Sequence, residues 1–171
     1  MAFLYFCGII CISKEILLFS NELVCNIIEY LNNNINKEIT INELSLLFYF
    51  DKTYIMKRFK KELGISINEY INTIRIYNSL SYFKDDNYVL NIALNNGFNS
   101  LEYFSETFKK IMGVSPTIYK NYLGHLDISN DDLGRIISNV SRISSIKFNA
   151  LDYLSHRKRD VRGYVKILKL K

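Results

Sequence analysis

The sequence predicts an all-α fold in which two copies of one helical unit are joined by a long connecting helix, giving about seven helices, with an extra C-terminal extension. Three observations lead to this prediction. A single proline among 171 residues leaves nearly the whole chain free to be helical. Hydrophobic residues make up 49% and charged residues 23%, a balance typical of globular proteins. The third observation is an internal repeat, which fixes how the helices are organised.

The repeat is found when the chain is compared with itself at an offset of 49 residues. Within the 17 positions from 54 to 70, seven residues recur 49 positions later. They are Tyr54, Phe59, Lys60, Lys61, Gly64, Ser66 and Tyr70, which match Tyr103, Phe108, Lys109, Lys110, Gly113, Ser115 and Tyr119. Each copy is predicted to hold a short helix, a tight turn, a longer helix, and a Gly-x-Ser string that opens the next helix.

Capping residues define the helices of the first copy, which follow an opening helix predicted at 22–31. Thr40 and Glu43 have the spacing of a capping box, so a short helix is predicted to start there. Asp51 is predicted to cap the longer helix, and Gly64 to end it. These signals place a tight turn between the two helices.

The connecting helix is predicted from a second capping box, formed by Ser66 and Glu69, to about Lys84. Its apolar residues recur at helical spacing. They are Ile67, Tyr70, Ile71, Ile74, Leu80 and Phe83.

The second copy shows the same order of signals. Its short helix is predicted at Val89–Asn95, followed by a turn in which Gly97 supplies a positive φ. Asn99 is predicted to cap the longer helix. Ser115-Pro116 combines a capping serine with proline at the first helical position, which predicts a last short helix through about Tyr122.

A short helix, a tight turn and a second helix form the arrangement that places a recognition helix in the DNA major groove. At 100° per residue, the longer helix of the first copy turns apolar residues and one carboxylate inward, at Ile55, Phe59, Glu62 and Leu63. Its outward side carries Lys52, Thr53, Met56, Lys57, Lys60 and Lys61. From Asp51 to Lys61 five basic residues stand against one acidic residue, a local charge of +4 that suits contact with phosphates.

The longer helix of the second copy has the same geometry with balanced charge. Its inward residues are Phe104, Phe108 and Ile111, and its outward residues are Glu102, Ser105, Glu106, Lys109 and Lys110. A carboxylate can accept a hydrogen bond from cytosine but repels phosphate, so this helix should read a narrow set of bases or bind more weakly than the first. For either helix taken alone, a polar face that is merely solvated is the alternative.

The charge of the whole chain does not indicate nucleic-acid binding. The net charge is +5, but residues 1–123 hold 12 Lys and Arg against 12 Asp and Glu, whereas residues 124–171 hold 10 against 5. The excess therefore lies in the C-terminal extension.

Cysteine and histidine usage predicts no metal site and no cofactor. The three cysteines, Cys7, Cys11 and Cys25, do not form a disulfide framework and fit a reducing cytoplasm. No Cys/His pair completes a zinc site, since His125 and His156 stand alone. The apolar run 1–12 is much shorter than the roughly 20 residues of a membrane span, so no membrane partner is expected.

The chain resembles the DNA-binding domain of the AraC/XylS family of bacterial transcription regulators over about residues 21–123. The resemblance rests on 41–44, on the Tyr54-Ile-Met-Lys-Arg-Phe-Lys-Lys-Glu-Leu-Gly run, on 70–75, and above all on Ile92-Ala93 followed by residues 97–116 and Tyr119. It implies two helix-turn-helix subdomains, joined by the long helix, that enter successive major-groove segments on one face of double-stranded DNA. RNA polymerase is a second candidate partner.

The resemblance also implies residue roles. Base-reading positions fall on Lys52, Thr53, Met56 and Lys57 in the first recognition helix and on Leu101, Glu102, Ser105 and Glu106 in the second. Phosphate-facing positions fall on Lys60, Lys61, Lys109 and Lys110. Arg75 is either a structural anchor on the connecting helix or a DNA contact.

Three features depart from the family pattern. Ser45 and Ser79 stand where small alanine-like residues are usual, a change expected to be tolerated. Glu106 stands where a basic residue is common, which predicts weaker binding by the second helix. The third departure is the length of residues 1–20, which is too short for the sensing or dimerising domain that such regulators usually carry.

The flanks leave several interpretations open. The apolar segment 1–20 is a helix that contacts something else or the remnant of an upstream domain, and the chain is a fragment, a degenerate product or a stand-alone form. Residues 124–171 form a basic extension of unknown role, with a loosely helical apolar stripe from Leu133 to Leu154. The near-alternating Val161–Lys171 predicts a basic strand or an unpaired extension. A solvated tail, a DNA-contacting tail and the start of another domain are the alternatives.

An enzyme is the weakest functional class, and none is predicted, because no nucleophile-base pair, no paired carboxylates in a pocket-forming context and no glycine-rich phosphate loop can be placed. The rival function is a protein-interaction module that keeps the fold but has little or no DNA binding, as the carboxylates Glu102 and Glu106 suggest.

Overall fold

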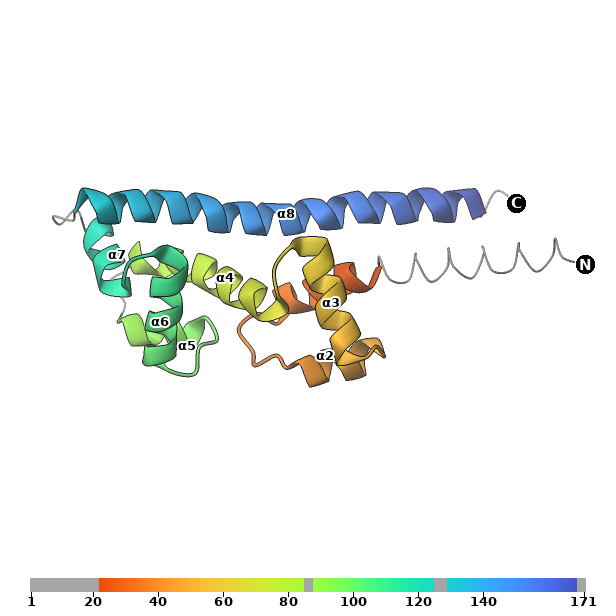
Figure 1. Cartoon of the computed structure of the whole chain (residues 1–171), viewed down its shortest axis with the longest axis horizontal. Helices are drawn as coiled ribbons and strands as arrows, with labels where there is room; N and C mark the ends of the chain where they lie inside the picture. The colour runs from red at the N-terminus through yellow and green to blue at the C-terminus, as the bar shows by residue number, and fades with distance from the viewer. Residues whose placement is uncertain (1–21, 85–87, 125–128, 169–171) are drawn as a thin grey trace, which may run out of the picture.

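The computed structural model describes residues 22–84, 88–124 and 129–168, and every regular element in these ranges is a helix (Figure 1). The all-α prediction is confirmed. An opening helix at 22–33 comes first. It is followed by α2 (Ile41–Phe48), α3 (Lys52–Leu63), α4 (Ile67–Ser79), the 3-10 helix η1 (Leu80–Lys84), α5 (Val89–Asn95), α6 (Leu101–Met112), α7 (Pro116–Leu123) and α8 (Asn130–Leu168). The predicted connecting helix is thus α4 continued by η1.

The capping signals position the helices largely as predicted. The Thr40–Glu43 capping box is present, with both reciprocal hydrogen bonds. The Asp51 carboxylate accepts hydrogen bonds from two backbone amides at the start of α3. The Ser115 hydroxyl caps α7 by accepting one hydrogen bond, from the amide of Ile118, and Pro116 is the first residue of α7.

One cap was predicted at the wrong residue. The side chain that caps α6 belongs to Ser100, whose hydroxyl accepts a hydrogen bond from the amide of Tyr103, and not to Asn99. Asparagine and serine are about equally good caps, so the sequence alone does not decide between adjacent residues.

Each repeat has its own hydrophobic core. The first contains Leu23, Val24, Ile27, Ile28, Leu31, Ile35, Leu44, Ile55, Phe59, Ile67, Tyr70, Ile71, Ile74 and Ala150. The second contains Ile76, Phe83, Ile92, Ala93, Phe98, Phe104, Phe108, Met112, Val114, Tyr119, Ile136 and Ile143. Among the elements that the structure describes, only α4 and α8 contribute buried residues to both cores, so these two helices join the subdomains.

Arg75 on α4 connects the two subdomains and is largely buried. Its guanidinium donates hydrogen bonds to the carbonyl oxygens of Ile35 (2.8 Å) and Lys37 (2.6 Å), which belong to the first subdomain. The same group lies 5.7 Å from the ring centroid of Phe98 in the second. Of the two roles considered for Arg75, the structure supports the structural anchor.

The two serines that depart from the family pattern are accommodated. The Ser79 hydroxyl is fully buried and donates to the carbonyl oxygen of Ile76 at 2.7 Å. The Ser45 hydroxyl donates to the carbonyl oxygen of Phe50, also at 2.7 Å.

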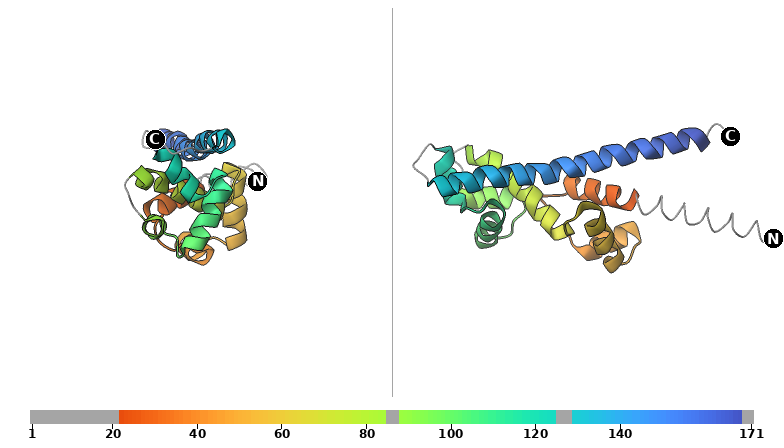
Figure 2. Two further views of the ribbon diagram at one scale, coloured as in Figure 1. Left: turned by 90° about the vertical axis from the view of Figure 1, so that its left-hand side faces the viewer. Right: turned by 45° about the horizontal axis from the view of Figure 1, so that its top comes forward.

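The C-terminal extension is one long helix that lies along both subdomains (Figures 1 and 2). The prediction of a strand or unpaired extension at Val161–Lys171 is wrong, because α8 continues through Leu168. A plain solvated tail is also wrong for the first part of α8, where Ile136, Ile143 and Ala150 are buried. The alternation of apolar and basic residues after Val161 is typical of a strand, but α8 continues through this segment as far as Leu168.

Some predictions concern residues outside the described ranges, namely those for the apolar segment 1–20 with Cys7 and Cys11, and for His125. Cys25 is described and is buried, as expected for an apolar cysteine. Within the described ranges, no helix is both long enough and apolar enough to cross a membrane.

Candidate nucleic-acid interface

The first candidate recognition helix, α3, has one buried face and one exposed face. Ile55 and Phe59 are fully buried in the first core, as the helical phasing predicts. Glu62, predicted to face inward, is half-buried, and its carboxylate pairs with the guanidinium of Arg58 at 2.9 Å. The exposed face carries all six residues assigned to it, which are Lys52, Thr53, Met56, Lys57, Lys60 and Lys61.

The ends of α3 are held firmly. Amide hydrogen bonds from Thr53 and Tyr54 hold the pKa of the Asp51 carboxyl below its ordinary value. At the other end Gly64 has a φ of 76°, and its amide donates to the carbonyl oxygen of Lys60. A helix with both termini fixed presents its side chains in a defined direction, which base reading requires.

The second candidate recognition helix, α6, has the same construction. Phe104 and Phe108 are fully buried, and Ile111 is half-buried on the same side. The polar residues Glu102, Glu106, Lys109 and Lys110 are exposed. Two of its assigned base-reading residues, Leu101 and Ser105, are only half-exposed, so α6 offers fewer free side chains than α3.

The two helices therefore differ in charge and in access. The exposed face of α3 presents four lysines and no carboxylate, whereas that of α6 presents two lysines and two carboxylates. Phosphate attraction is strong on the first face and nearly cancelled on the second. The difference in charge between the two helices that the sequence predicts is therefore present on the surface of the folded protein.

The two candidate recognition helices lie in different subdomains, on either side of α4, and run in roughly the same direction (Figure 1). In Figure 1 both rise toward α8, with their C-terminal ends near it. Contacts support this: the Arg142 guanidinium of α8 donates to the carbonyl oxygen of Ile111 at 2.7 Å, and the Tyr153 hydroxyl lies 3.4 Å from a carboxylate oxygen of Glu62. The N-terminal halves, which carry the assigned base-reading residues, extend away from α8.

Sequence reasoning missed a bond that places α6 relative to α4. The Asn72 side-chain amide donates to the Tyr103 hydroxyl at 3.0 Å, which joins the connecting helix to the second recognition helix. In the sequence Tyr103 is the repeat partner of Tyr54 and part of the 97–116 string, and neither pattern indicates this bond. The Tyr54 ring stacks on Phe50 instead. The tyrosines at this position of the repeat therefore make different contacts in the two copies.

The turn of the first copy was also not singled out. Tyr49 adopts a left-handed conformation with φ 58° and is 93% exposed. Leu46 on α2 is 78% exposed nearby in sequence. No pattern of spacing marks an exposed tyrosine in a turn, so only the structure reveals it.

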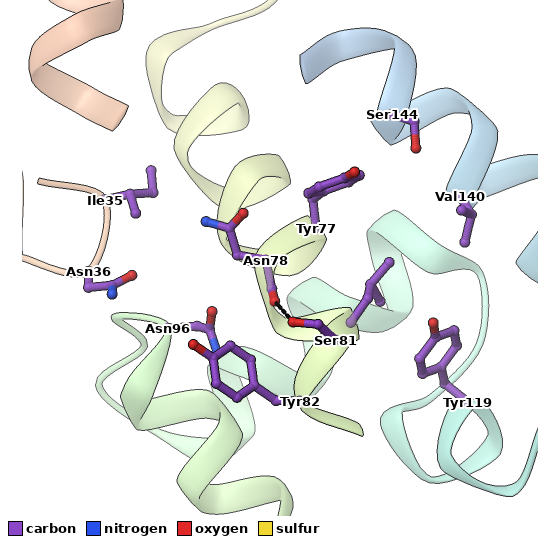
Figure 3. A pocket seen from close by; sticks show the side chains of 11 residues that line it. Ile35, Asn36, Tyr77, Asn78, Ser81, Tyr82, Asn96, Tyr119, Val140 and Ser144 are labelled. Carbon is purple, nitrogen blue, oxygen red and sulfur yellow. Dashed lines mark hydrogen bonds between the residues drawn. The ribbon is translucent and has the colours of Figure 1, made fainter. Parts of the chain in front are cut away.

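A pocket of about 530 Å³ lies away from this surface (Figure 3). Its lining comes from the loop after the opening helix, from α4 and η1, from Asn96 at the end of α5, and from α7 and α8, and includes Tyr77, Asn78, Tyr119, Val140 and Ser144. None of the assigned base-reading or phosphate-facing residues lines it. The pocket is therefore separate from the candidate interface.

Comparison with known proteins agrees with this geometry. Residues 48–122 match the family model described as a helix-turn-helix domain. An HTH-type transcriptional regulator of Staphylococcus aureus is 28% identical over 104 residues, which are 60% of this chain and 14% of that protein. The regulator YtdP of Bacillus subtilis is 30% identical over 96 residues, which are 56% of this chain and 12% of YtdP.

Solved structures show the same fold. The C-terminal domain of AraT, a response regulator from Geobacillus stearothermophilus, is 26% identical with a TM-score of 0.56, over 63% of this chain and 88% of that one. A DNA-binding transcriptional dual regulator from Escherichia coli is 21% identical with a TM-score of 0.51, over 62% and 93%.

Residues 48–122 therefore form a helix-turn-helix domain of the kind found in bacterial transcription regulators. Together these matches confirm the resemblance to the DNA-binding domain of the AraC/XylS family that the sequence showed. The chain spans only 14% of the length of the Staphylococcus aureus regulator and 12% of that of YtdP.

Proposed function

We propose that this chain is a sequence-specific regulator of transcription, not an enzyme, that inserts α3 and α6 into successive major-groove segments of double-stranded DNA in the bacterial cytoplasm. The observation that supports this most is the repeated construction of two parallel helices, each with a buried aromatic face and an exposed polar face. Two groove-reading elements on one chain do not need a second subunit, so binding as a monomer follows.

The exposed side chains divide into two roles. On α3, Lys52, Thr53, Met56 and Lys57 face the bases, and Lys60 and Lys61 meet phosphates. On α6, Glu102 and Glu106 can accept hydrogen bonds from cytosine amino groups, with Leu101 and Ser105 beside them, and Lys109 and Lys110 meet phosphates. The positive charge of α3 makes it the main source of affinity, and α6 adds selectivity.

A salt titration of the purified full chain with a duplex selected from a random library tests the proposal. If about five lysines meet phosphates, the logarithm of affinity should fall with the logarithm of salt at a slope of about −4 to −5. Lys57→Ala should weaken binding strongly. Arg135→Ala removes one positive charge from an exposed position on α8 and is the matched control. Binding that is absent at 50 mM salt, or insensitive to salt, would refute the proposal and favour a protein-interaction module.

The unequal roles of the two helices have their own test. Glu106→Arg should tighten binding to random duplex and steepen the salt slope by about one unit, because it replaces a charge that repels phosphate. If Glu106 reads a cytosine, the same change should weaken binding to the selected duplex. Glu22→Arg on the opening helix is the control for the change in net charge. No effect on either duplex would mean that α6 does not enter the groove.

Contact with RNA polymerase stays a prediction from the family resemblance. A footprint on a selected promoter with and without polymerase would test it.

A further inference from the structure

The C-terminal helix α8 lies outside the segment matched by the family model, yet it contacts both subdomains. Ile136 and Ile143 are buried in the second core, and Ala150 is buried in the first. Ala150 follows Ile143 by seven positions, so α8 crosses from one core to the other in about two turns. Both subdomains therefore pack against the same helix.

At the second subdomain, α8 contacts the C-terminal end of the recognition helix α6. Arg142 donates to the carbonyl oxygen of Ile111 at 2.7 Å, and the Asn139 amide donates to that of Met112 at 3.1 Å. The last carbonyls of a helix have no partner within it, so these two bonds satisfy them from outside. They fix where α6 ends relative to α8.

At the first subdomain, α8 contacts the corresponding end of α3. The Tyr153 hydroxyl lies 3.4 Å from a Glu62 carboxylate oxygen, and Tyr153 also packs against the first core. Glu62 and Ile111 are equivalent positions of the 49-residue repeat. The same helix thus contacts the same place in both copies.

Between these contacts α8 meets the connecting helix. The Lys147 ammonium lies 4.3 Å from the ring centroid of Tyr77 and 3.5 Å from the side-chain oxygen of Asn78. Next to this contact, Val140 and Ser144 form one wall of the open pocket of Figure 3. Because the pocket leaves open space next to α4, α4 alone does not fill the region between the subdomains on the side that faces α8.

We propose that α8 fixes the separation and relative orientation of α3 and α6, with Arg142, Asn139, Ala150 and Tyr153 as positioning residues, and so determines the half-site spacing that the protein accepts. This inference rests on the proposed function only for its DNA consequence. One added base pair moves a half-site by about 3.4 Å and rotates it by about 35°, so a rigid pair of helices should reject it.

The first test measures the geometry without DNA. Spin labels are placed at Thr53→Cys and Glu102→Cys, near the N-terminal ends of α3 and α6, in the full chain with Cys7, Cys11 and Cys25 replaced by alanine. The distance distribution should be narrow, and Ala150→Glu, which puts a carboxylate into the first core, should widen it at least twofold. Arg135→Gln should leave it unchanged, because the Arg135 guanidinium pairs with Asp132 of the same helix.

An unchanged distribution in folded Ala150→Glu protein would overturn the inference. If circular dichroism shows that this variant does not fold, the double variant Asn139→Ala with Arg142→Gln releases the other end of α8 from exposed or half-exposed positions. It should widen the distribution equally, and a narrow distribution there would refute the inference.

The second test uses the selected duplex with one base pair inserted between its half-sites. The unmodified chain should lose at least tenfold in affinity, whereas the α8 variants should lose threefold or less. An equal loss in both would overturn the role of α8 in spacing. A library that yields no enriched duplex would refute the proposed function, while the spin-label distances would still decide whether α8 fixes the geometry.

Discussion

Replacing Arg75 with methionine tests whether the subdomains depend on this buried guanidinium. Methionine keeps an unbranched side chain but removes both hydrogen bonds to the carbonyl oxygens of Ile35 and Lys37. Burial lowers the pKa of Arg75, but a guanidinium stays charged at neutral pH, so both lost bonds come from a charged donor.

The magnitude follows from the surroundings of the two acceptors. A hydrogen bond to a charged group contributes about 1.5–3 kcal/mol. The Ile35 carbonyl belongs to a buried residue and would lose its partner, whereas Lys37 is exposed and water can replace the bond there. We therefore expect Arg75→Met to lower the free energy of unfolding by about 2–4 kcal/mol, which is a fall in Tm of about 5–15 °C for a chain of this size.

Urea unfolding followed by circular dichroism measures this loss. Arg135→Met, which removes an exposed arginine from α8, should change the free energy of unfolding by less than about 0.5 kcal/mol. The loss in Arg75→Lys should be smaller than that in Arg75→Met but larger than that in Arg135→Met, because an ammonium cannot make both of the hydrogen bonds that the planar guanidinium makes. A loss below about 1 kcal/mol in Arg75→Met, together with DNA affinity at least tenfold weaker, would show a DNA contact in place of an anchor.

Three further predictions concern stability. Phe59→Ala and Phe108→Ala should each lower the free energy of unfolding by about 3–5 kcal/mol, because both rings are fully buried; an unchanged Tm in both would show that the helix phasing is wrong. Gly97→Ala should destabilise more than Gly64→Ala, although both glycines have positive φ: a Cβ at Gly97 would lie 2.9 Å from the backbone of the loop after the opening helix, whereas nothing lies within 4 Å at Gly64. Equal falls in Tm for Gly97→Ala and Gly64→Ala would contradict this prediction. The pKa of Asp51 is lower in the folded chain than its ordinary value of 3.8, so the ionised cap stabilises the fold above that pH and the contribution is lost as pH falls through the folded pKa. Thermal scans of Asp51→Asn should therefore show a deficit relative to the unmodified chain at pH 6 that disappears near pH 2, and a constant difference would be inconsistent with this linkage.

The double helix-turn-helix fold could be predicted because its signals are local. The capping box at Thr40, the cap at Asp51 and the glycine at 97 each act within one turn of chain, and the 49-residue offset relates the copies. The outward residues of α3 followed from helical phasing once its start was known. Local chemistry is therefore sufficient for this part of the fold.

The remaining features depend on contacts between distant residues. The apolar stripe of α8 is interrupted by serines and by Lys147, whose ammonium lies against the Tyr77 ring, so the stripe looked weaker than the packing that it makes. The role of Arg75 required the position of a loop 40 residues earlier. The bond between Asn72 and Tyr103 likewise joins residues far apart in sequence.

The two cores share no buried side chain, yet both include residues of α8. If one core unfolded, the part of α8 that packs on it would lose its buried contacts. That part would then be an exposed helix, which is unstable on its own in water. Folding of each half is thereby linked to the other, and the chain should unfold in one cooperative transition. Amides on α4 should then exchange with solvent at the same slow rate on both sides of Arg75.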